Sequence, residues 1–309
     1  MPGVIPHFRF QYELDSIRSI DPDVELPEVV YEVEPPLAYV TLNRPERRNA
    51  FNDALYIGLF GGLHRALLDD TVRVVIVRGA GQGFSAGHDL TSPTKADGLP
   101  EETPPVPPTF RPTVADYFNF ERRRCQKYEE LLGYPKLVIA QVHGFCIGAG
   151  AFVQSACDFT YAAEDARFGT RSFAHQLTGI VAVDSGWPGR SHTLRGGSLD
   201  EVSGARAAEI GLINGAFPSA LLDENVKGEA LRLAALPLET VARIKQWYAH
   251  LWDTAGLGLS YRAHYQSHTA AQWIRHRPGE NNFYKVRGQQ GLSGYFRERA
   301  ASATPGGDD

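Results

Sequence analysis

The first clear pattern in the chain is an alternation of hydrophobic and polar positions. The segments VVYEVE (29–34) and LAYVTLN (37–43) both alternate, and two prolines stand between them. This spacing predicts a β-hairpin. In residues 52–68, apolar side chains recur at intervals of three and four positions, which predicts an amphipathic helix.

Three later segments are short runs of apolar residues, which indicate buried strands. They are VRVVIVRG (72–79), KLVIAQVHG (136–144) and FTYAA (159–163). Residues 114–132 and 148–158 have helical patterns and alternate with these runs. Recurring strand–helix–strand units favour an α/β core with right-handed crossovers.

The chain after residue 200 is mainly helical in its pattern, and we expect helices at 200–210, 221–235, 239–252 and 259–274. Residues 91–113 contain seven prolines, which exclude a long helix there and predict a surface loop. A loop of this length is either a lid over a site or a disordered insertion. We expect an N-terminal extension (1–28), a core (29–215) that contains this loop, and a helical C-terminal region (216–309).

Composition narrows the classes of function without choosing one. The chain has 309 residues, of which 43% are hydrophobic and 22% charged, and a net charge of −5. This balance provides no basic field for nucleic acid or an anionic membrane. No apolar run approaches the roughly 20 residues of a membrane span, and the N-terminus lacks the apolar centre of a signal peptide. We therefore expect a cytoplasmic protein.

The three cysteines, Cys125, Cys146 and Cys157, do not form a CxxC pair. An odd number at these spacings indicates reduced thiols rather than a disulfide framework or a zinc site. We expect neither a metal nor a bound cofactor.

Two glycine-rich junctions carry the candidate chemistry. GQGFSAGHDL (81–90) directly follows a predicted strand, and HGFCIGAGAF (143–152) joins a strand to a helix. Glycine lets the backbone approach a ligand closely, and N–H groups at the start of a helix bind developing negative charge. Two such junctions together are able to bind one carbonyl oxygen. Glycine-rich turns at strand ends are also common for structural reasons alone, so this alternative stays open.

Several motifs occur in an order that resembles the crotonase superfamily, the enoyl-CoA hydratase/isomerase family. They are YVTLNRPERRNAFN (39–52), VVIVRGAGQGFSAGHDL (74–90), the segment from KLVIAQVHG to DARFG (136–169), and RAAEIGLINGAF (206–217). The resemblance implies a spiral of ββα units with a helical C-terminal trimerisation region. It also implies a homotrimer or hexamer, and a small-molecule acyl-CoA substrate that carries coenzyme A as part of itself.

The same resemblance assigns residues to roles. It places one oxyanion N–H at His88, in SAGHD, and the other at Ala149, in the middle of the second glycine-rich motif. Residues expected to contact coenzyme A are Arg47, Arg48, Ala50, Ala86, Asp89 and Leu90. The two arginines would face phosphates, or alternatively would simply lie in solvent.

Hydratases of this family use two glutamates, and both positions differ here. The first position holds Phe152 and the second holds Ser172, so that these two residues would line the substrate site. Phenylalanine transfers no protons, and serine is a poor acid or base without a partner. The usual hydration mechanism is therefore not expected.

A different pair stands nearby. His175 and Asp184 flank the stretch QLTGIVAV, and this arrangement resembles 6-oxocamphor hydrolase, a crotonase homologue that cleaves a carbon–carbon bond of a β-diketone. The resemblance implies that His175 activates water and that Asp184 orients it. Two alternatives remain, namely an ordinary structural His175, and Asp184 as a nucleophile as in the crotonase-type 4-chlorobenzoyl-CoA dehalogenase.

The sequence therefore predicts a hydrolase or lyase that acts on an acyl-CoA or a β-dicarbonyl compound through an enolate or oxyanion. Hydrolytic (retro-Claisen) carbon–carbon cleavage is the first hypothesis. The second is a hydratase- or isomerase-like activity with non-standard acid and base residues. The third is a non-catalytic acyl-CoA binder that has kept the fold alone.

Overall fold

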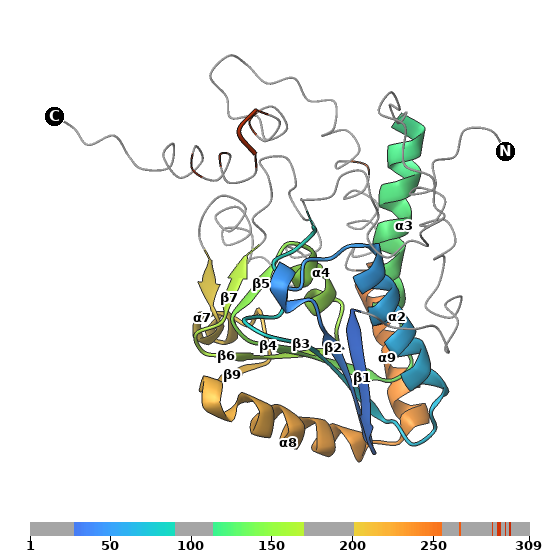
Figure 1. Ribbon diagram of the computed structural model, residues 1–309. Coiled ribbons are helices and arrows are strands. Elements are labelled where there is room, and N and C mark those ends of the chain that lie inside the picture. Colours follow the sequence, from blue (N-terminus) through green and yellow to red (C-terminus); the bar gives the residue numbers. More distant parts are fainter. Residues whose placement is uncertain are drawn as a thin grey trace.

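A computed structural model describes residues 28–89, 114–169 and 201–254, with isolated positions between 266 and 297 (Figure 1). The N-terminal extension up to residue 27, the proline-rich loop and the expected helix at 259–274, apart from residue 266, lie outside the described residues. Within residues 28–89, 114–169 and 201–254, no helix has the length and the apolar composition that crossing a bilayer requires.

The core is a six-stranded sheet in the order β1-β2-β3-β4-β6-β9. The strands are β1 (Val29–Glu34), β2 (Leu37–Leu42), β3 (Val74–Gly79), β4 (Leu137–Val142), β6 (Phe159–Ala163) and β9 (Gly215–Phe217). β1 and β2 form the predicted antiparallel hairpin, and all other pairs are parallel. Every residue of β4 is buried, which explains why its sequence is a continuous apolar run.

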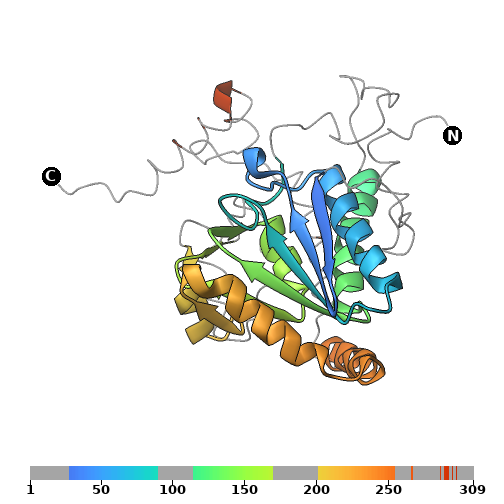
Figure 2. The same ribbon diagram turned by 60° about the horizontal axis from the view of Figure 1, so that its bottom comes forward.

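Helices cover both faces of this sheet (Figures 1 and 2). Helix α2 (Asp53–Leu68) begins after Asn52, whose side chain accepts a hydrogen bond of 2.8 Å from the Leu55 N–H. Its apolar stripe includes Leu55, Leu59 and Leu63, which are fully buried. Helix α8 (Leu222–Ala234) crosses the opposite face of the sheet.

The expected helices at 114–132, 148–158 and 239–252 are confirmed as α3 (Val114–Leu132), α4 (Ala149–Ser155) and α9 (Leu238–Thr254). The expected helix at 200–210 was wrong in its first part, where the chain forms strand β8 (Val202–Ser203). Helix α7 (Gly204–Glu209) starts only after Ser203, whose hydroxyl accepts from the Arg206 N–H at 3.2 Å.

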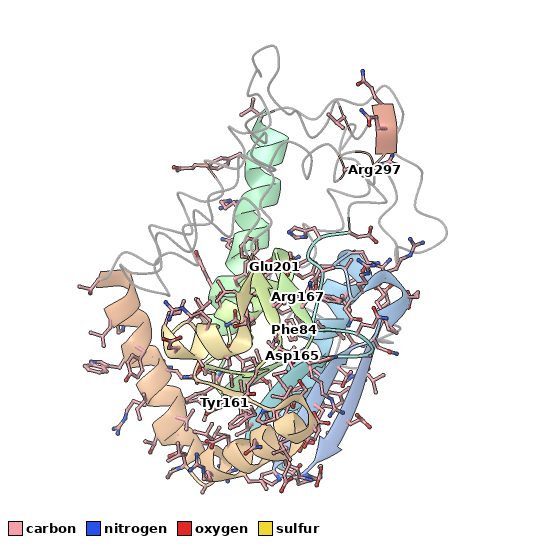
Figure 3. The ribbon with its side chains drawn as sticks, turned by 90° about the vertical axis from the view of Figure 1, so that its left-hand side faces the viewer. Phe84, Tyr161, Asp165, Arg167, Glu201 and Arg297 are labelled. Carbon is pink, nitrogen blue, oxygen red and sulfur yellow. The ribbon has the colours of Figure 1, made fainter. Side chains whose placement is uncertain are left out.

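Strand β8 belongs to a second, three-stranded sheet that the sequence patterns did not predict. Its order is β5-β7-β8, with β5 at Phe145–Ile147 and β7 at Arg167–Gly169. In Figure 3, Arg167 lies beside Glu201, and the two side chains form an ion pair of 3.4 Å. This small sheet holds the second glycine-rich segment against the main core.

The expected boundary between a core and a C-terminal region falls inside β9, since that strand spans residues 215–217. Helix α8 then packs on the main sheet, and α9 is attached to it by a buried ion pair. The Lys245 ammonium lies 2.7 Å from Asp158 Oδ2, which also accepts a hydrogen bond of 2.8 Å from the Val138 N–H. Residues after 215 therefore complete the core.

Burial is the largest cause of the pKa shift of each partner in this pair. It raises the pKa of the Asp158 carboxyl above its ordinary value, while the Lys245 charge opposes that shift. It lowers the pKa of Lys245, and here the Asp158 charge acts in the opposite direction. Lys245 Nζ also donates to the Lys136 carbonyl oxygen at 3.1 Å, which joins α9 directly to the start of β4.

Candidate functional site

The candidate site lies where three parallel strands end at the same edge of the sheet. The chain leaves β2 at Leu42, β3 at Gly79 and β4 at Val142, and each strand is followed by one of the sequence motifs described above. Ligands of open parallel sheets bind outside the carboxyl ends of the strands, where the connecting loops meet. This edge therefore brings the two glycine-rich segments and the arginine-rich turn together.

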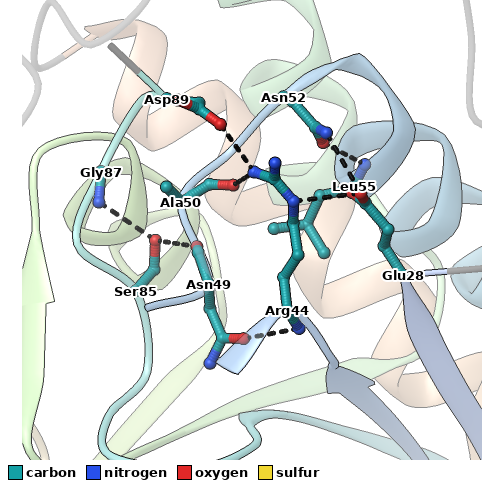
Figure 4. Close-up of polar contacts among 9 residues, drawn as sticks. All are labelled: Glu28, Arg44, Asn49, Ala50, Asn52, Leu55, Ser85, Gly87 and Asp89. Carbon is teal, nitrogen blue, oxygen red and sulfur yellow. Dashed lines mark hydrogen bonds and ion pairs between the residues drawn. The ribbon is translucent and has the colours of Figure 1, made fainter. Parts of the chain in front are cut away.

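Asn49 joins the turn after β2 to the loop after β3 (Figure 4). Its side-chain oxygen accepts from the Arg44 N–H at 2.8 Å, and its amide nitrogen donates to the carbonyls of Ala80 and Gly83 at 2.8 and 2.9 Å. The residue is fully buried and has a φ of 51°, a left-handed conformation that asparagine tolerates better than most residues. One side chain thus satisfies three backbone groups from two loops.

Ser85 continues this network into the oxyanion segment (Figure 4). Its hydroxyl donates to the Asn49 carbonyl at 2.7 Å and accepts from the Gly87 N–H at 3.1 Å. Its backbone pairs with β5, since the Ser85 N–H donates to the Phe145 carbonyl and the Ile147 N–H donates to the Ser85 carbonyl. The two glycine-rich segments are therefore fixed to each other by main-chain hydrogen bonds.

The backbone around His88 has a defined direction. Phe51 donates its N–H to the Gly87 carbonyl at 2.7 Å and accepts from the Asp89 N–H at 2.9 Å. These two bonds form a parallel bridge opposite His88. Because successive amides of an extended segment point to opposite sides, the N–H of His88 is directed away from Phe51.

Ala149 is the first residue of α4, so its N–H has no acceptor within the helix. Gly87 lies directly beside it. A Cβ atom at Gly87 would lie 3.1 Å from the Ile147 carbonyl oxygen and 3.5 Å from the Ala149 nitrogen, and Gly87 has a φ of 101°. Glycine at this position keeps the space next to the Ala149 N–H open. The structure thus brings the segments of His88 and Ala149 together, as the sequence predicted.

The Asp89 side chain has a structural partner. Its carboxylate lies 2.9 Å from Arg44 Nη1, and the same guanidinium contacts Glu28 at 3.0 Å and the Ala50 carbonyl at 2.8 Å. Asp89 is one of the residues expected to contact coenzyme A. In the structure, its side chain holds the segment that carries His88 against the turn after β2 (Figure 4).

The other expected coenzyme A contacts are placed as follows. Arg47 and Arg48 are exposed at this edge, a position that fits either phosphate contact or simple solvation. Ala50 and Ala86 are partly buried, and the Ala86 N–H donates to the Arg48 carbonyl at 3.0 Å. Four expected site residues, Leu90, Ser172, His175 and Asp184, lie outside the described residues.

Phe152 occupies the first glutamate position on α4, and it is only 6% exposed. Its ring packs edge-on against Tyr128, with 5.8 Å between the centroids. The side chain therefore fills an apolar space and exchanges no protons. His143, which also lies in the second motif, bonds the Gly81 carbonyl through Nε2 at 2.9 Å and so connects two loops.

The described cysteines, Cys146 and Cys157, are both buried and unpaired with each other. Burial raises the pKa of both thiols, which keeps them protonated and poorly nucleophilic. They agree with the expected reduced thiols.

The sequence reasoning missed Arg44 and Asn49, although both stand in the RPERRNA segment. Arg47 and Arg48 are the residues of that segment whose charge predicts phosphate contact, whereas the roles of Arg44 and Asn49 depend on partners from distant segments. The identity of Asn49 could have predicted its role, because asparagine side chains in loops often form hydrogen bonds with the backbone of a turn.

We expect Asn49→Asp to lower the free energy of unfolding by about 3 kcal/mol or more, because a carboxylate lacks the two donors and would face the Ala80 and Gly83 carbonyls. Urea denaturation measures the change. Asn225→Asp is the matched control, since that exposed amide bonds a single carbonyl, and it should change stability by less than about 0.5 kcal/mol. Equal midpoints for both variants would contradict the role of Asn49.

Comparison with known proteins agrees with this architecture. A family model described as enoyl-CoA hydratase/isomerase matches residues 37–174. EchA13 of Mycobacterium tuberculosis, whose name places it with the enoyl-CoA hydratases, is 31% identical over 256 residues, which are 77% of this chain and 78% of that protein. The 1,2-epoxyphenylacetyl-CoA isomerase of Escherichia coli is 32% identical over 225 residues, covering 71% of this chain and 80% of the relative.

Solved structures give the same result. An enoyl-CoA hydratase from Mycobacterium smegmatis matches 90% of this chain and 96% of its own with a TM-score of 0.75 and 26% identity. The fold is that of the crotonase superfamily. Within that superfamily, the chain belongs to the enoyl-CoA hydratase/isomerase family.

Proposed function

We propose that the protein is an enzyme that binds an acyl-CoA and stabilises an enolate or tetrahedral oxyanion with the N–H groups of His88 and Ala149. The observation that carries this proposal is the contact between their two segments, where Gly87 leaves space beside the Ala149 N–H. Backbone donors held in a rigid network stabilise developing charge without reorganising. Both segments have this support from Ser85 and Asn49.

Coenzyme A enters as part of the substrate, and we propose neither a metal nor another cofactor. The names of the relatives support a thioester, since they include a 2,3-dehydroadipyl-CoA hydratase of E. coli and a hydroxycinnamoyl-CoA hydratase-lyase of Pseudomonas fluorescens. Exposed Arg47 and Arg48 are available to the phosphates at the same edge. A free β-diketone is the substrate to test beside the thioesters.

We further propose a homotrimer or hexamer in the cytoplasm. Support for an interface comes from α9, where Ile244, Trp247, Tyr248 and Leu251 are exposed on one helical face. Residues three, four and seven positions apart lie on the same side of a helix.

The reaction we propose is hydrolytic carbon–carbon cleavage, with His175 as the base that activates water and Asp184 as its orienting carboxylate. It is supported by the buried phenyl ring of Phe152, since no carboxylate is present there for the usual hydration. A second candidate, a hydratase or isomerase with non-standard acid and base groups, is favoured by the names of the relatives. An acyl-CoA binder without catalysis is the third.

Mass spectrometry of products in H₂¹⁸O distinguishes these candidates, using a panel of β-ketoacyl-CoA, β-diketone and enoyl-CoA compounds. Cleavage should yield two products, one of which is a carboxylic acid that carries the label. His175→Ala should lose this product, whereas His250→Ala, at an exposed position on α9, should retain it. Full turnover by His175→Ala, or crotonyl-CoA hydration without any cleavage, would overturn the assignment.

A further inference from the structure

Two buried tyrosine hydroxyls near the candidate site have no role in the function proposed so far. Tyr56 lies on α2 and Tyr128 on α3, and these helices stand side by side in Figures 1 and 2. Their hydroxyl oxygens are 2.7 Å apart, so that one hydroxyl donates a hydrogen bond to the other. Tyr56 is 4% exposed and Tyr128 is 2% exposed.

The pair connects the two ends of the candidate site. The Tyr128 ring contacts Phe152, which occupies the first glutamate position, at 5.8 Å between centroids. The Tyr56 ring lies 6.2 Å from the imidazole of His88 and 4.7 Å from the ring of Phe51. The hydrogen-bonded pair therefore links the ring of an expected oxyanion residue to the side chain at the position where family hydratases have an acid.

A cation is placed beside the pair. Lys127 is only 5% exposed, and its ammonium nitrogen lies 5.5 Å from the centroid of the Tyr56 ring. A buried positive charge at this distance attracts the ring face, and it would also stabilise a phenolate more strongly than a neutral phenol.

Packing alone does not require these hydroxyls, because phenylalanine rings would fill the same space. Tyr134 shows what a structural hydroxyl does here, as it donates to the Leu63 carbonyl at 2.7 Å and thereby ties two helical segments. The Tyr56–Tyr128 pair differs, because two hydroxyls that bond each other use only one of their two protons in that bond. The pair therefore contains a second proton that this hydrogen bond does not use.

We propose that the Tyr56–Tyr128 pair is the acid that protonates the enolate carbon of the acyl substrate. The O–H bond of one tyrosine breaks, and a C–H bond forms at the carbon next to the thioester carbonyl. The resulting phenolate accepts a hydrogen bond from the other tyrosine and is stabilised by Lys127. Water later returns the proton, so that the pair ends each turnover neutral.

This inference rests on the proposed enolate chemistry, but it is tested without the cleavage reaction. Butyryl-CoA tests the same step in both directions, because the phenolate form of the pair takes a proton from the α-carbon and the pair, after exchange with D₂O, returns a deuteron to it. Mass spectrometry should show exchange with the wild-type protein. Tyr56→Phe and Tyr128→Phe keep the rings, and each should slow exchange by about 100-fold.

Tyr134→Phe is the matched control, because it removes a buried, hydrogen-bonded hydroxyl away from the pair and should leave the exchange rate within about twofold. His175→Ala should also keep exchange, even if it abolishes cleavage. Absence of cleavage with tyrosine-dependent exchange would defeat the proposed reaction but retain the pair. The inference is overturned if the wild type shows no exchange, or if both phenylalanine variants, folded by circular dichroism, exchange at the wild-type rate.

Discussion

Ala149→Pro should lower kcat/KM by about 100- to 1000-fold while the protein stays folded. Proline removes the N–H of Ala149 and no other backbone donor. Ala149 is the first residue of α4, the helical position at which proline is most readily accepted. The preceding Gly148, with φ of 54° and ψ of −115°, has the conformational freedom of glycine before the new ring. Steady-state kinetics on the substrate identified by product analysis measures the loss.

Two controls separate the missing donor from other effects. Ala149→Gly keeps the N–H and should retain most of the activity. Free coenzyme A has no acyl carbonyl, so its affinity for Ala149→Pro, measured by calorimetry, should be unchanged. A folded Ala149→Pro protein with wild-type kcat/KM would show that this amide does not stabilise the transition state.

Lys245→Met should reduce the free energy of unfolding by about 3–5 kcal/mol at pH 7, because it leaves the Asp158 carboxylate buried without its cation. Guanidinium denaturation provides the measurement. Lys227→Met serves as the control, since Lys227 forms an exposed ion pair with Glu34 and its loss should hardly move the midpoint. A wild-type midpoint for Lys245→Met would contradict the role of the pair in holding α9.

The deficit of Lys245→Met should shrink as the pH falls from 7 toward 4. Burial already raises the pKa of Asp158, and removing the opposing cation raises it further in the folded protein. A folded-state pKa above the unfolded value means that protonation on acidification favours the folded state of the variant. The double variant Lys245→Met/Asp158→Asn should be more stable at pH 7 than Lys245→Met alone, because the buried charge is gone.

Five strands of the main sheet could be predicted because they carry local patterns, whereas the three-residue strand β9 was not predicted. Strands β1 and β2 are long enough to show alternation, and β3, β4 and β6 are long enough to be seen as apolar runs. Strands β5, β7 and β8 are only two or three residues long. Their pairing depends on distant segments, such as the bridge between Ser85 and Cys146, and no local period records it.

In the site, too, features with a local sequence pattern could be predicted, and contacts between distant segments could not. The segments around His88 and Ala149 were predicted from glycine spacing and family resemblance, and the structure brings them together. The Tyr56–Tyr128 contact joins residues 72 positions apart, and each tyrosine alone looks like part of an apolar helical stripe. The roles of His175 and Asp184 stay predictions, since both residues lie outside the described part of the chain.

The N–H groups of His88 and Ala149 are held by main-chain and loop contacts, so their positions do not depend on the acid or base side chains of the site. Ser85 and Asn49 fix the segment of His88, while the start of α4 presents the Ala149 N–H whatever side chain follows it. Phe152 stands one turn later, and its side chain takes no part in that anchoring. Substitutions at that turn can therefore replace the acid or base side chains of the site, while the N–H groups of His88 and Ala149 stay in place. Evolution of a new reaction on this scaffold needs no rebuilding of the donor pair.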